Sequence, residues 1–317
     1  MNIVYFGSGA FGLPTLEALA QRHTIAAIVT QPDRKAGRGK TLTPTPIAAW
    51  ASEHLPETPL YKPENVNEPE IRDQIRAHAG DRPDDRAWVI IAFGQKLSPE
   101  LLADRFSMNL HASLLPRWRG AAPINAAMVA GDTETGNSVI TLADRMDAGL
   151  VLGQSRRPIE PTQTKADLED LLASDGPELV LDVLARHAEG SLAPQTQDES
   201  AVTLAPKMQK SDGRVDFRDD ADICRCRVNG YSPWPAVTVG YNDQPLKILR
   251  ADSQQREGDD PPGTIIDEKA GLIACAPGTA LRAIEVQPPG KKPMPWGDFA
   301  RGRSVKKGDT LEQPPAT

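Results

Sequence analysis

The stretch that decides the fold lies at the start of the chain, where residues 2–12 read Asn-Ile-Val-Tyr-Phe-Gly-Ser-Gly-Ala-Phe-Gly. Asn2–Phe6 is a short apolar run of the kind that forms a buried strand. Pro14–Arg22 follows with leucines three residues apart, a spacing that predicts a helix with one apolar face. A strand that enters a helix through a glycine-rich turn is typical of α/β proteins with a parallel sheet.

The first half of the chain repeats this alternation. Further strands are predicted at Ile25–Thr30, Ala87–Ala92, Met108–His111 and Gly136–Leu142. Further helices are predicted at Ile47–His54, Pro69–Ala79, Ser98–Ala103 and Lys165–Glu189, the last with a break or restart at Gly176-Pro177. The alternation predicts an α/β domain with a mostly parallel sheet and a binding crevice at the carboxyl ends of its strands.

The composition changes after Gly190, where a polar stretch that contains Pro194 predicts a linker. Beyond it the chain shows short strand patterns separated by turn residues, at Ala236–Tyr241, Leu246–Ala251, Gly263–Asp267, Leu272–Ala276 and Ala280–Gln287. Asn242-Asp243 is the expected turn of a hairpin between the first two. We therefore predict an α/β domain at 1–190, a linker at 191–206, a small β-barrel or sandwich at 207–309 and a tail at 310–317.

The overall composition describes an ordinary globular protein of two domains, with 317 residues, 39% of them apolar and 25% charged. No apolar run reaches the roughly 18 residues that cross a bilayer, and the N-terminus lacks the features of a signal peptide. Three cysteines are an odd and sparse set that fits a reducing compartment. We therefore expect a cytoplasmic protein with no membrane partner.

The glycine-rich turn matches a dinucleotide-binding motif, because Gly7, Gly9 and Gly12 are spaced as G-x-G-x-x-G and Asp33 follows about 20 residues later. An NAD-dependent dehydrogenase is therefore one hypothesis. The alternative is a turn whose glycines serve only close packing. Pro14 at the start of the helix removes one N–H from an anion site, and Asp33 lies in a basic loop, so both favour the alternative.

A second stretch carries the residues for catalysis, since residues 109–124 read Asn-Leu-His-Ala-Ser-Leu-Leu-Pro-Arg-Trp-Arg-Gly-Ala-Ala-Pro-Ile. Asn109 and His111 are two apart on a predicted strand and point to the same face. Asp147 follows some 36 residues after His111, in Met-Asp-Ala-Gly. An amide, an imidazole and a carboxylate are therefore expected to converge at the edge of the sheet.

These three groups suit the attack of an amine on a formyl group. The amide of Asn109 can donate to the tetrahedral oxyanion, and His111 with Asp147 can handle the proton that leaves the amine. Each residue also has a purely structural interpretation: a packed histidine, an amide that bonds a turn, and an ordinary turn aspartate. Ser113 lies outside any G-x-S-x-G elbow, which argues against a hydrolase. No cluster of residues has the spacing of metal ligands, and no metal is expected.

With Ser-Leu-Leu-Pro at 113–116 between them, Asn109, His111 and Asp147 resemble the 10-formyltetrahydrofolate-dependent formyltransferases. Three further stretches resemble the members of that family that act on methionyl-tRNA: the basic loop at 30–40, Arg-Trp-Arg-Gly-Ala-Ala-Pro-Ile at 117–124, and Asn-Gly-Tyr-Ser-Pro-Trp-Pro at 229–235. The resemblance covers nearly the whole chain. It implies a Rossmann-like catalytic domain with helices on both faces of the sheet, followed by an OB-like β-barrel.

The resemblance also implies roles for individual residues. Asn109, His111 and Asp147 are expected to be catalytic. Four residues are expected to contact the folate donor: Ser113, Leu114, Leu115 and Pro116. Initiator methionyl-tRNA is the expected acceptor, and 10-formyltetrahydrofolate is the expected formyl donor. The charged helical segment near 73–86 and the residues after Arg303 depart from the pattern, which puts the RNA footprint in doubt more than the chemistry.

The formal net charge of −7 argues against extensive nucleic-acid binding, so RNA contacts have to come from local basic patches. Six residues are predicted to contact tRNA: Arg34, Lys35, Arg38, Lys40, Arg117 and Arg119. The first four lie within seven residues, in a loop that Gly37 and Gly39 allow to follow a phosphate backbone. The same loop could be merely a solvated charged segment. Two further alternatives are a formyltransferase for amino-sugar nucleotides and a folate- or RNA-binding module without activity. We expect a monomer.

Overall fold

The computed structural model describes residues 1–36, 41–78 and 86–312, and its chain forms two compact units. Unit 1 consists of 1–119, 136–156 and 170–203, and unit 2 consists of 120–135, 157–169 and the chain from 204 onward. The chain therefore passes between the units several times. The domain boundaries at 190, 206 and 309 stay a prediction.

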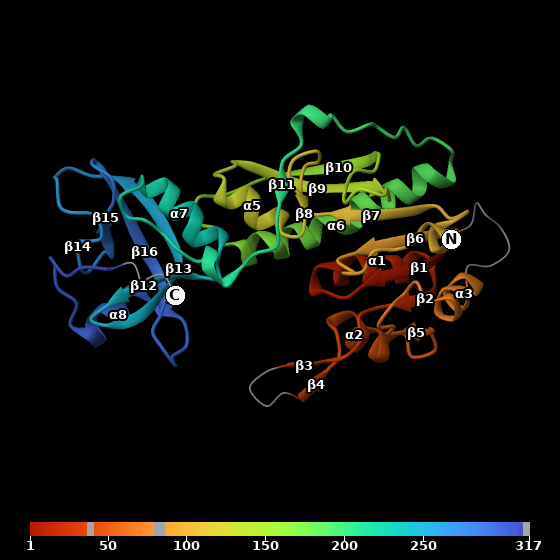
Figure 1. The fold of residues 1–317 in the computed structure, drawn as a ribbon, viewed down its shortest axis with the longest axis horizontal. Helices are drawn as coiled ribbons and strands as arrows, with labels where there is room; N and C mark the ends of the chain where they lie inside the picture. The colour runs from red at the N-terminus through yellow and green to blue at the C-terminus, as the bar shows by residue number, and fades with distance from the viewer. Residues whose placement is uncertain (37–40, 79–85, 313–317) are drawn as a thin grey trace. The chain divides into compact units, whose positions relative to one another are not determined.

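Unit 1 is built on a seven-stranded sheet in the order β10-β9-β7-β6-β1-β2-β5 (Figure 1). Its strands are β1 (Asn2–Gly7), β2 (Thr24–Val29), β5 (Leu60–Tyr61), β6 (Arg86–Ile91), β7 (Ser107–His111), β9 (Glu134–Thr141) and β10 (Val151–Pro158). Five neighbouring strands pair in parallel, in the order β5, β2, β1, β6 and β7 along the sheet, and β9 pairs antiparallel with β7. The predicted mostly parallel sheet is thus confirmed.

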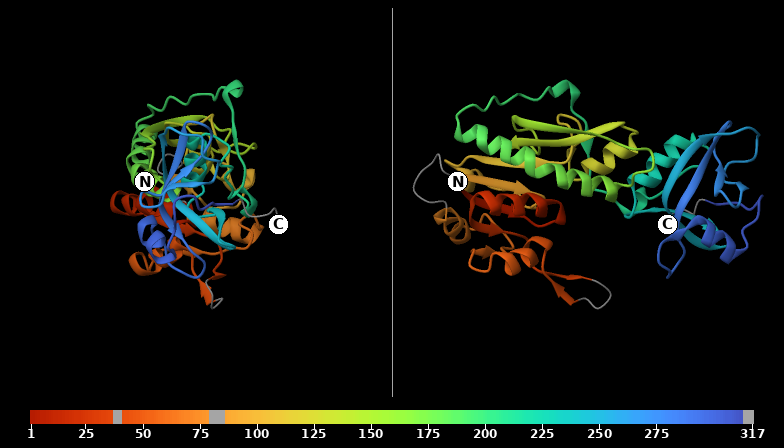
Figure 2. Two further views of the ribbon diagram at one scale, coloured as in Figure 1. Left: turned by 90° about the vertical axis from the view of Figure 1, so that its left-hand side faces the viewer. Right: turned by 180° about the vertical axis from the view of Figure 1, so that it is seen from behind.

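Helices cover both faces of this sheet, as the alternation of side chains along a strand requires. Its helices are α1 (Leu13–Arg22), α2 (Pro46–His54), α3 (Pro69–Ala77), α4 (Pro99–Leu102) and α6 (Lys165–Ala188). Ile3 and Tyr5 of β1 pack in one cluster with side chains of α1, α2 and α6. Val4 and Phe6 pack in another with side chains of α3 and α4. Figure 2, in its view from behind, shows the long helix α6 in green along one face of the sheet.

Several features of unit 1 differ from the prediction. The helix α6 runs without a break through Pro177, and after the proline its side chains Leu179, Val180, Val183 and Leu184 pack in the same cluster as the strands of the sheet. Gly176 permits this close approach, since a Cβ there would lie 2.8 Å from Leu110 of β7. The strand β10 was missed because its side chains are mostly polar. The basic loop begins as a short hairpin of β3 (Arg34–Ala36) and β4 (Thr41–Thr43).

Unit 2 contains an antiparallel sheet in the order β12-β13-β16-β15-β14, with β17 paired to β16. The strands are β12 (Val237–Tyr241), β13 (Gln244–Gln255), β14 (Ile265–Asp267), β15 (Leu272–Ala274), β16 (Thr279–Gln287) and β17 (Met294–Pro295). Its helices are α5 (Pro123–Val129), α7 (Ala221–Gly230) and α8 (Trp296–Arg303). The smaller β domain is therefore confirmed, and the three helices were not predicted.

The hairpin between β12 and β13 turns at Asn242 and Asp243, both with positive φ, as a two-residue hairpin turn requires. The end of the chain bridges both edges of the sheet: Glu312 pairs with Gly240 of β12, and Thr310 pairs with Thr264 beside β14. One segment thus meets both edge strands, as an OB-like barrel would require. Among the described residues, no helix is long and apolar enough to cross a membrane.

Candidate active site

Strand β7 carries two of the three predicted catalytic residues at the carboxyl edge of the parallel strands. Asn109 and His111 lie on the same face of β7, where His111 pairs with Ser138 of β9. His111 is buried and Asn109 is half-buried. Within residues 1–36, 41–78 and 86–312, the Asn109 side chain makes no hydrogen bond, so its amide is available to another group.

The partners of His111 define the state of its ring. Nε2 lies 2.9 Å from the carbonyl oxygen of Trp118, and Nδ1 lies 3.6 Å from Oδ2 of Asp147. A carbonyl oxygen only accepts a hydrogen bond, so Nε2 carries a proton. In the neutral ring, Nδ1 is then an acceptor that faces the Asp147 carboxylate across a gap slightly longer than a hydrogen bond.

Asp147 lies in the turn between β9 and β10, and its side chain is 14% exposed. Its φ of 53° places it in the left-handed region, where a residue other than glycine is strained. Gly149 tightens the turn, since a Cβ there would lie 1.7 Å from the carbonyl oxygen of Thr141. The structure therefore brings together an imidazole and a carboxylate that are 36 residues apart, with Asn109 on the same strand as the imidazole.

The predicted folate loop at 113–116 is held by two side chains that sequence reasoning missed, Ser138 of β9 and Gln154 of β10. Oγ of Ser138 donates to the carbonyl of Ser113 at 2.6 Å and accepts from the backbone N–H of Leu115 at 3.0 Å. Gln154 donates to the carbonyl of Leu115 at 2.9 Å and to Oγ of Ser138 at 2.8 Å. Nothing in the sequence marks these residues, because the contacts depend on the pairing of β7 with β9.

The rest of the loop is partly accessible. Ser113 and Leu115 are buried, and Oγ of Ser113 donates to the carbonyl of Arg117 at 2.7 Å. Leu114 and Pro116 are half-buried. Ser113 and Leu115 are thus fixed in the loop, whereas Leu114 and Pro116 retain some exposed surface.

The predicted tRNA contacts differ in their placement. Arg34 and Lys35 lie on β3 and are exposed, and Arg34 pairs with exposed Glu64 at 2.6 Å, a contact of little energetic value. Arg117 is exposed and lies 5.0 Å from the centre of the Trp118 ring. Arg38 and Lys40 lie outside the described residues.

Arg119 differs from the other basic residues, because it is only 5% exposed. Its Nε donates to Oε1 of Gln197 at 3.0 Å, and its Nη2 donates to Oε1 of Glu199 at 2.9 Å. Hydrogen bonds from Arg119 and Arg145 lower the pKa of the Glu199 carboxyl. This placement gives no support to an RNA contact for Arg119.

The glycine-rich turn at 7–12 is explained by packing. A Cβ on Gly12 would lie 2.2 Å from the hydroxyl of Tyr5, and a Cβ on Gly7 would lie 2.9 Å from the carbonyl oxygen of Ile91. Asp33, the acidic residue of the proposed dinucleotide motif, pairs with Lys62 at 2.7 Å. These contacts favour the packing interpretation and leave the dehydrogenase hypothesis without structural support.

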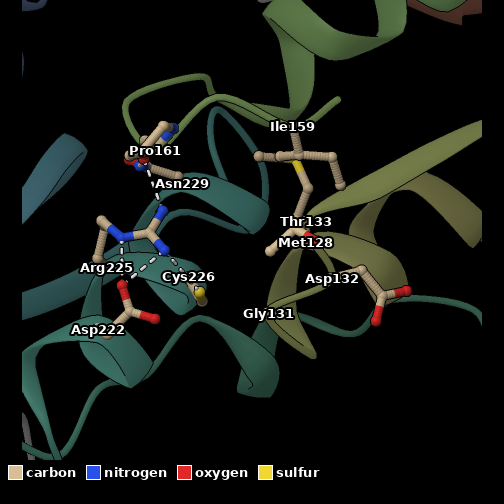
Figure 3. A pocket seen from close by; sticks show the side chains of 10 residues that line it. All are labelled: Met128, Gly131, Asp132, Thr133, Ile159, Pro161, Asp222, Arg225, Cys226 and Asn229. Atoms are coloured by element: carbon tan, nitrogen blue, oxygen red, sulfur yellow. Dashed lines mark hydrogen bonds and ion pairs between the residues drawn. The ribbon is translucent and has the colours of Figure 1, made fainter. Parts of the chain in front are cut away.

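A crevice of about 120 Å³ in unit 2 is drawn in Figure 3, and it contains none of the predicted site residues. Arg225 dominates its wall, where it donates to Asp222, to the carbonyl of Pro161 and to Sγ of Cys226. These donors are used within the protein. In the part of the chain that the structure describes, no group of three or more His, Cys, Asp or Glu side chains could hold a metal ion.

Comparison with known protein families gives matches over both the parallel-sheet part of the chain and the antiparallel β part. The family described as formyl transferase matches residues 1–184, and its C-terminal domain matches residues 207–304. The chain therefore belongs to the formyl transferase family, an assignment that makes it a one-carbon transferase.

The family members most informative about this chain carry a more specific name. The methionyl-tRNA formyltransferase of Methylococcus capsulatus is 41% identical over 309 residues, which cover 96% of this chain and 98% of that protein. The methionyl-tRNA formyltransferase of Pseudomonas syringae pv. tomato is 39% identical over 311 residues, covering 96% of each chain.

Solved structures resemble the fold at much lower identity. The N-formyltransferase from Helicobacter canadensis, in complex with folinic acid and dTDP-3-aminofucose, superimposes with a TM-score of 0.67 at 14% identity. The match covers 89% of this chain and 98% of that protein. HypX from Aquifex aeolicus, in complex with tetrahydrofolic acid, gives a TM-score of 0.61 at 15% identity, over 98% of this chain and 50% of that protein. At these identities the likeness supports the fold alone.

Proposed function

We propose that this protein transfers the formyl group of 10-formyltetrahydrofolate to the α-amino group of methionine on initiator methionyl-tRNA. The observation that carries the proposal is the similarity, over 96% of the chain at 41% identity, to a protein named methionyl-tRNA formyltransferase. Such similarity extends through both units, whereas the amino-sugar formyltransferases resemble the chain only in fold.

The site supports a direct transfer. The methionyl amine attacks the formyl carbon, and the bond between that carbon and N10 of the folate breaks. In the tetrahedral intermediate, the amide of Asn109 donates to the oxyanion. The proton of the amine passes to Nδ1 of His111, since Nε2 already holds a proton against Trp118. The proton then reaches N10 of the departing tetrahydrofolate, so formylmethionyl-tRNA and tetrahydrofolate are the balanced products.

Asp147 has a defined part in this sequence. Its carboxylate lies 3.6 Å from Nδ1 of His111 and stabilises the imidazolium that forms when the proton arrives. The proton can also move to the carboxylate through a water molecule. The first route depends directly on this distance, so displacement of Asp147 slows the chemical step.

We assign the folate to the loop of Ser113, Leu114, Leu115 and Pro116, which the contacts of Ser138 and Gln154 hold in one conformation. For the tRNA we propose Arg34, Lys35, Arg38, Lys40 and Arg117. Solved relatives that hold folinic acid or tetrahydrofolic acid support the folate donor. A monomeric state and a cytoplasmic location stay predictions.

The proposal is tested by offering the purified protein 10-formyltetrahydrofolate together with two acceptors, methionyl-tRNA and an amino-sugar nucleotide. We expect formylation of the tRNA and none of the sugar. Formylation of the sugar alone would contradict the proposal and support an amino-sugar formyltransferase, which is the alternative suggested by the fold relatives.

Replacing Arg34, Lys35, Arg38 and Lys40 by alanine should raise KM for tRNA and reduce its salt dependence.

A further inference from the structure

The chain that leaves α6 returns over unit 1 and contacts both sides of the candidate active site. Residues 195–203, which we call the return segment, belong to unit 1 although the sequence predicts a linker at 191–206. The segment is anchored at Gln195, whose backbone exchanges two 2.8 Å hydrogen bonds with the backbone of Val151 on β10. It is therefore part of the fold of unit 1.

On one side, the return segment holds the turn of Asp147. Nε2 of Gln197 donates to the carbonyl of Asp147 at 2.7 Å and to the carbonyl of Gly149 at 2.7 Å. The two donors of one amide thus hold two carbonyls of one turn. Gln197 is only 7% exposed, so these bonds are shielded from water.

On the other side, the return segment holds the partner of His111. Oγ1 of Thr203 accepts from the backbone N–H of Trp118 at 2.9 Å, and the carbonyl of Trp118 receives Nε2–H of His111. The backbone N–H of Arg119 donates to the carbonyl of Thr203 at 3.0 Å. The position of the imidazole therefore depends on the same segment as that of the carboxylate.

Arg119 links the two sides. Its Nε donates to Oε1 of Gln197, which orients the amide so that its NH₂ group faces the Asp147 turn.

Both residues that the segment holds, Trp118 and Asp147, have φ values near 60° in the left-handed region, at 64° and 53°. Strained residues of this kind persist only where the surroundings hold them, and they are concentrated at active sites.

We propose that Gln197 is a positioning residue for the reaction, which sets the distance between His111 and Asp147 by holding the Asp147 turn. The inference rests on the proposed function, because the step that it affects is formyl transfer. A misplacement of about 1 Å in a catalytic group can cost about 100-fold in rate. Loss of the two hydrogen bonds from Gln197 to the Asp147 turn should therefore lower kcat while KM for both substrates stays nearly constant.

Two variants separate this role from simple stabilisation. Gln197→Glu keeps the volume and an acceptor for Arg119 but replaces the NH₂ donor, whereas Gln197→Ala removes both. The matched control is Asn137→Ala, which removes another buried amide that donates to a backbone carbonyl in unit 1, that of Leu172 on α6 at 2.8 Å. Among the described residues, the Asn137 side chain makes no hydrogen bond to the return segment.

The experiment measures kcat, KM and the melting temperature, together with the ¹³C signals of labelled histidine in the free protein. We expect kcat to fall about 10- to 100-fold in both Gln197 variants, with KM within about twofold, and the His111 signal to shift. In Asn137→Ala the melting temperature should fall while kcat and the His111 signal stay unchanged. A Gln197→Glu variant with wild-type kcat, or with an unshifted His111 signal, overturns the inference. If the wild-type protein does not transfer formyl groups to tRNA, the proposed function is refuted instead. The histidine signals of the variants would then still show whether Gln197 sets the surroundings of His111.

Discussion

Replacing Ser138 by alanine tests whether the folate loop is held as the structure indicates. Oγ of Ser138 makes three hydrogen bonds, two of them to the backbone of the loop at Ser113 and Leu115. Ser138, Ser113 and Leu115 are all buried. The substitution leaves one carbonyl and one N–H without these partners, and each buried unsatisfied group costs about 1–3 kcal/mol.

We expect the variant to lose about 2–4 kcal/mol of unfolding free energy, because partial relaxation of the loop offsets some of the cost. If about 1.4 kcal/mol of this loss appears in binding, KM for 10-formyltetrahydrofolate rises about tenfold. KM for methionyl-tRNA should stay within about twofold, because the loop is proposed to contact only the folate. Urea unfolding and steady-state kinetics measure these two effects.

The chain offers a matched control in Ser155 of β10. Its Oγ is buried, yet it has no hydrogen-bond partner among the residues that the structure describes. Ser155→Ala removes the same atom from the neighbouring strand, so stability and KM should hardly change. Equal stability and equal KM in the two variants would refute the account of the loop.

Three further predictions concern other parts of the molecule. Gly149→Ala should destabilise the protein by about 3 kcal/mol or more and lower activity, because its Cβ would collide with the Thr141 carbonyl; Gly302→Ala in helix α8, where the same group meets open space, should stabilise by about 0.5–1 kcal/mol in the same urea assay. Burial acts to raise the pKa of Asp167, but hydrogen bonds led by those from Arg250 outweigh it and lower the pKa. The resulting stabilisation is complete above the unfolded pKa of about 3.9 and is lost as the pH falls through the lower folded value. Asp167→Asn should therefore flatten the acid limb of a plot of stability against pH, and an unchanged limb would contradict this reasoning. All three cysteine thiols are buried, so they should react with Ellman's reagent only on unfolding, and rapid reaction in the native protein would disprove that placement.

Much of unit 1 could be predicted because its central strands are nearly continuous apolar runs. The strands β1, β2 and β6 are buried on both faces, so their sequences show the pattern of a parallel sheet directly. The predicted proximity of His111 and Asp147 required β7 to end at the carboxyl edge and also required the turn after β9 to lie beside His111. In these strands, the run of apolar residues in the sequence corresponds to burial of the side chains in the fold.

Other features depend on contacts that no local pattern encodes. The polar strand β10 forms because β9 offers it an edge, and α6 continues past Pro177 into a segment whose apolar side chains pack against the sheet. Gln197 lies in a polar, proline-containing stretch that resembles a linker. Arg119 lies in a basic sequence that resembles a surface patch, yet the return segment buries it. Only the fold shows that these two residues contact each other.

The central claim is that the amide of Asn109 and the His111–Asp147 pair together transfer the formyl group. The most direct measurement is the single-turnover rate of formyl transfer to methionyl-tRNA by Asn109→Ala, with the affinity for the folate measured on the same protein. Loss of one oxyanion donor should lower the rate about 100- to 1000-fold while folate affinity changes only about two- to threefold. A rate equal to that of the wild type, with folate binding intact, would contradict the account.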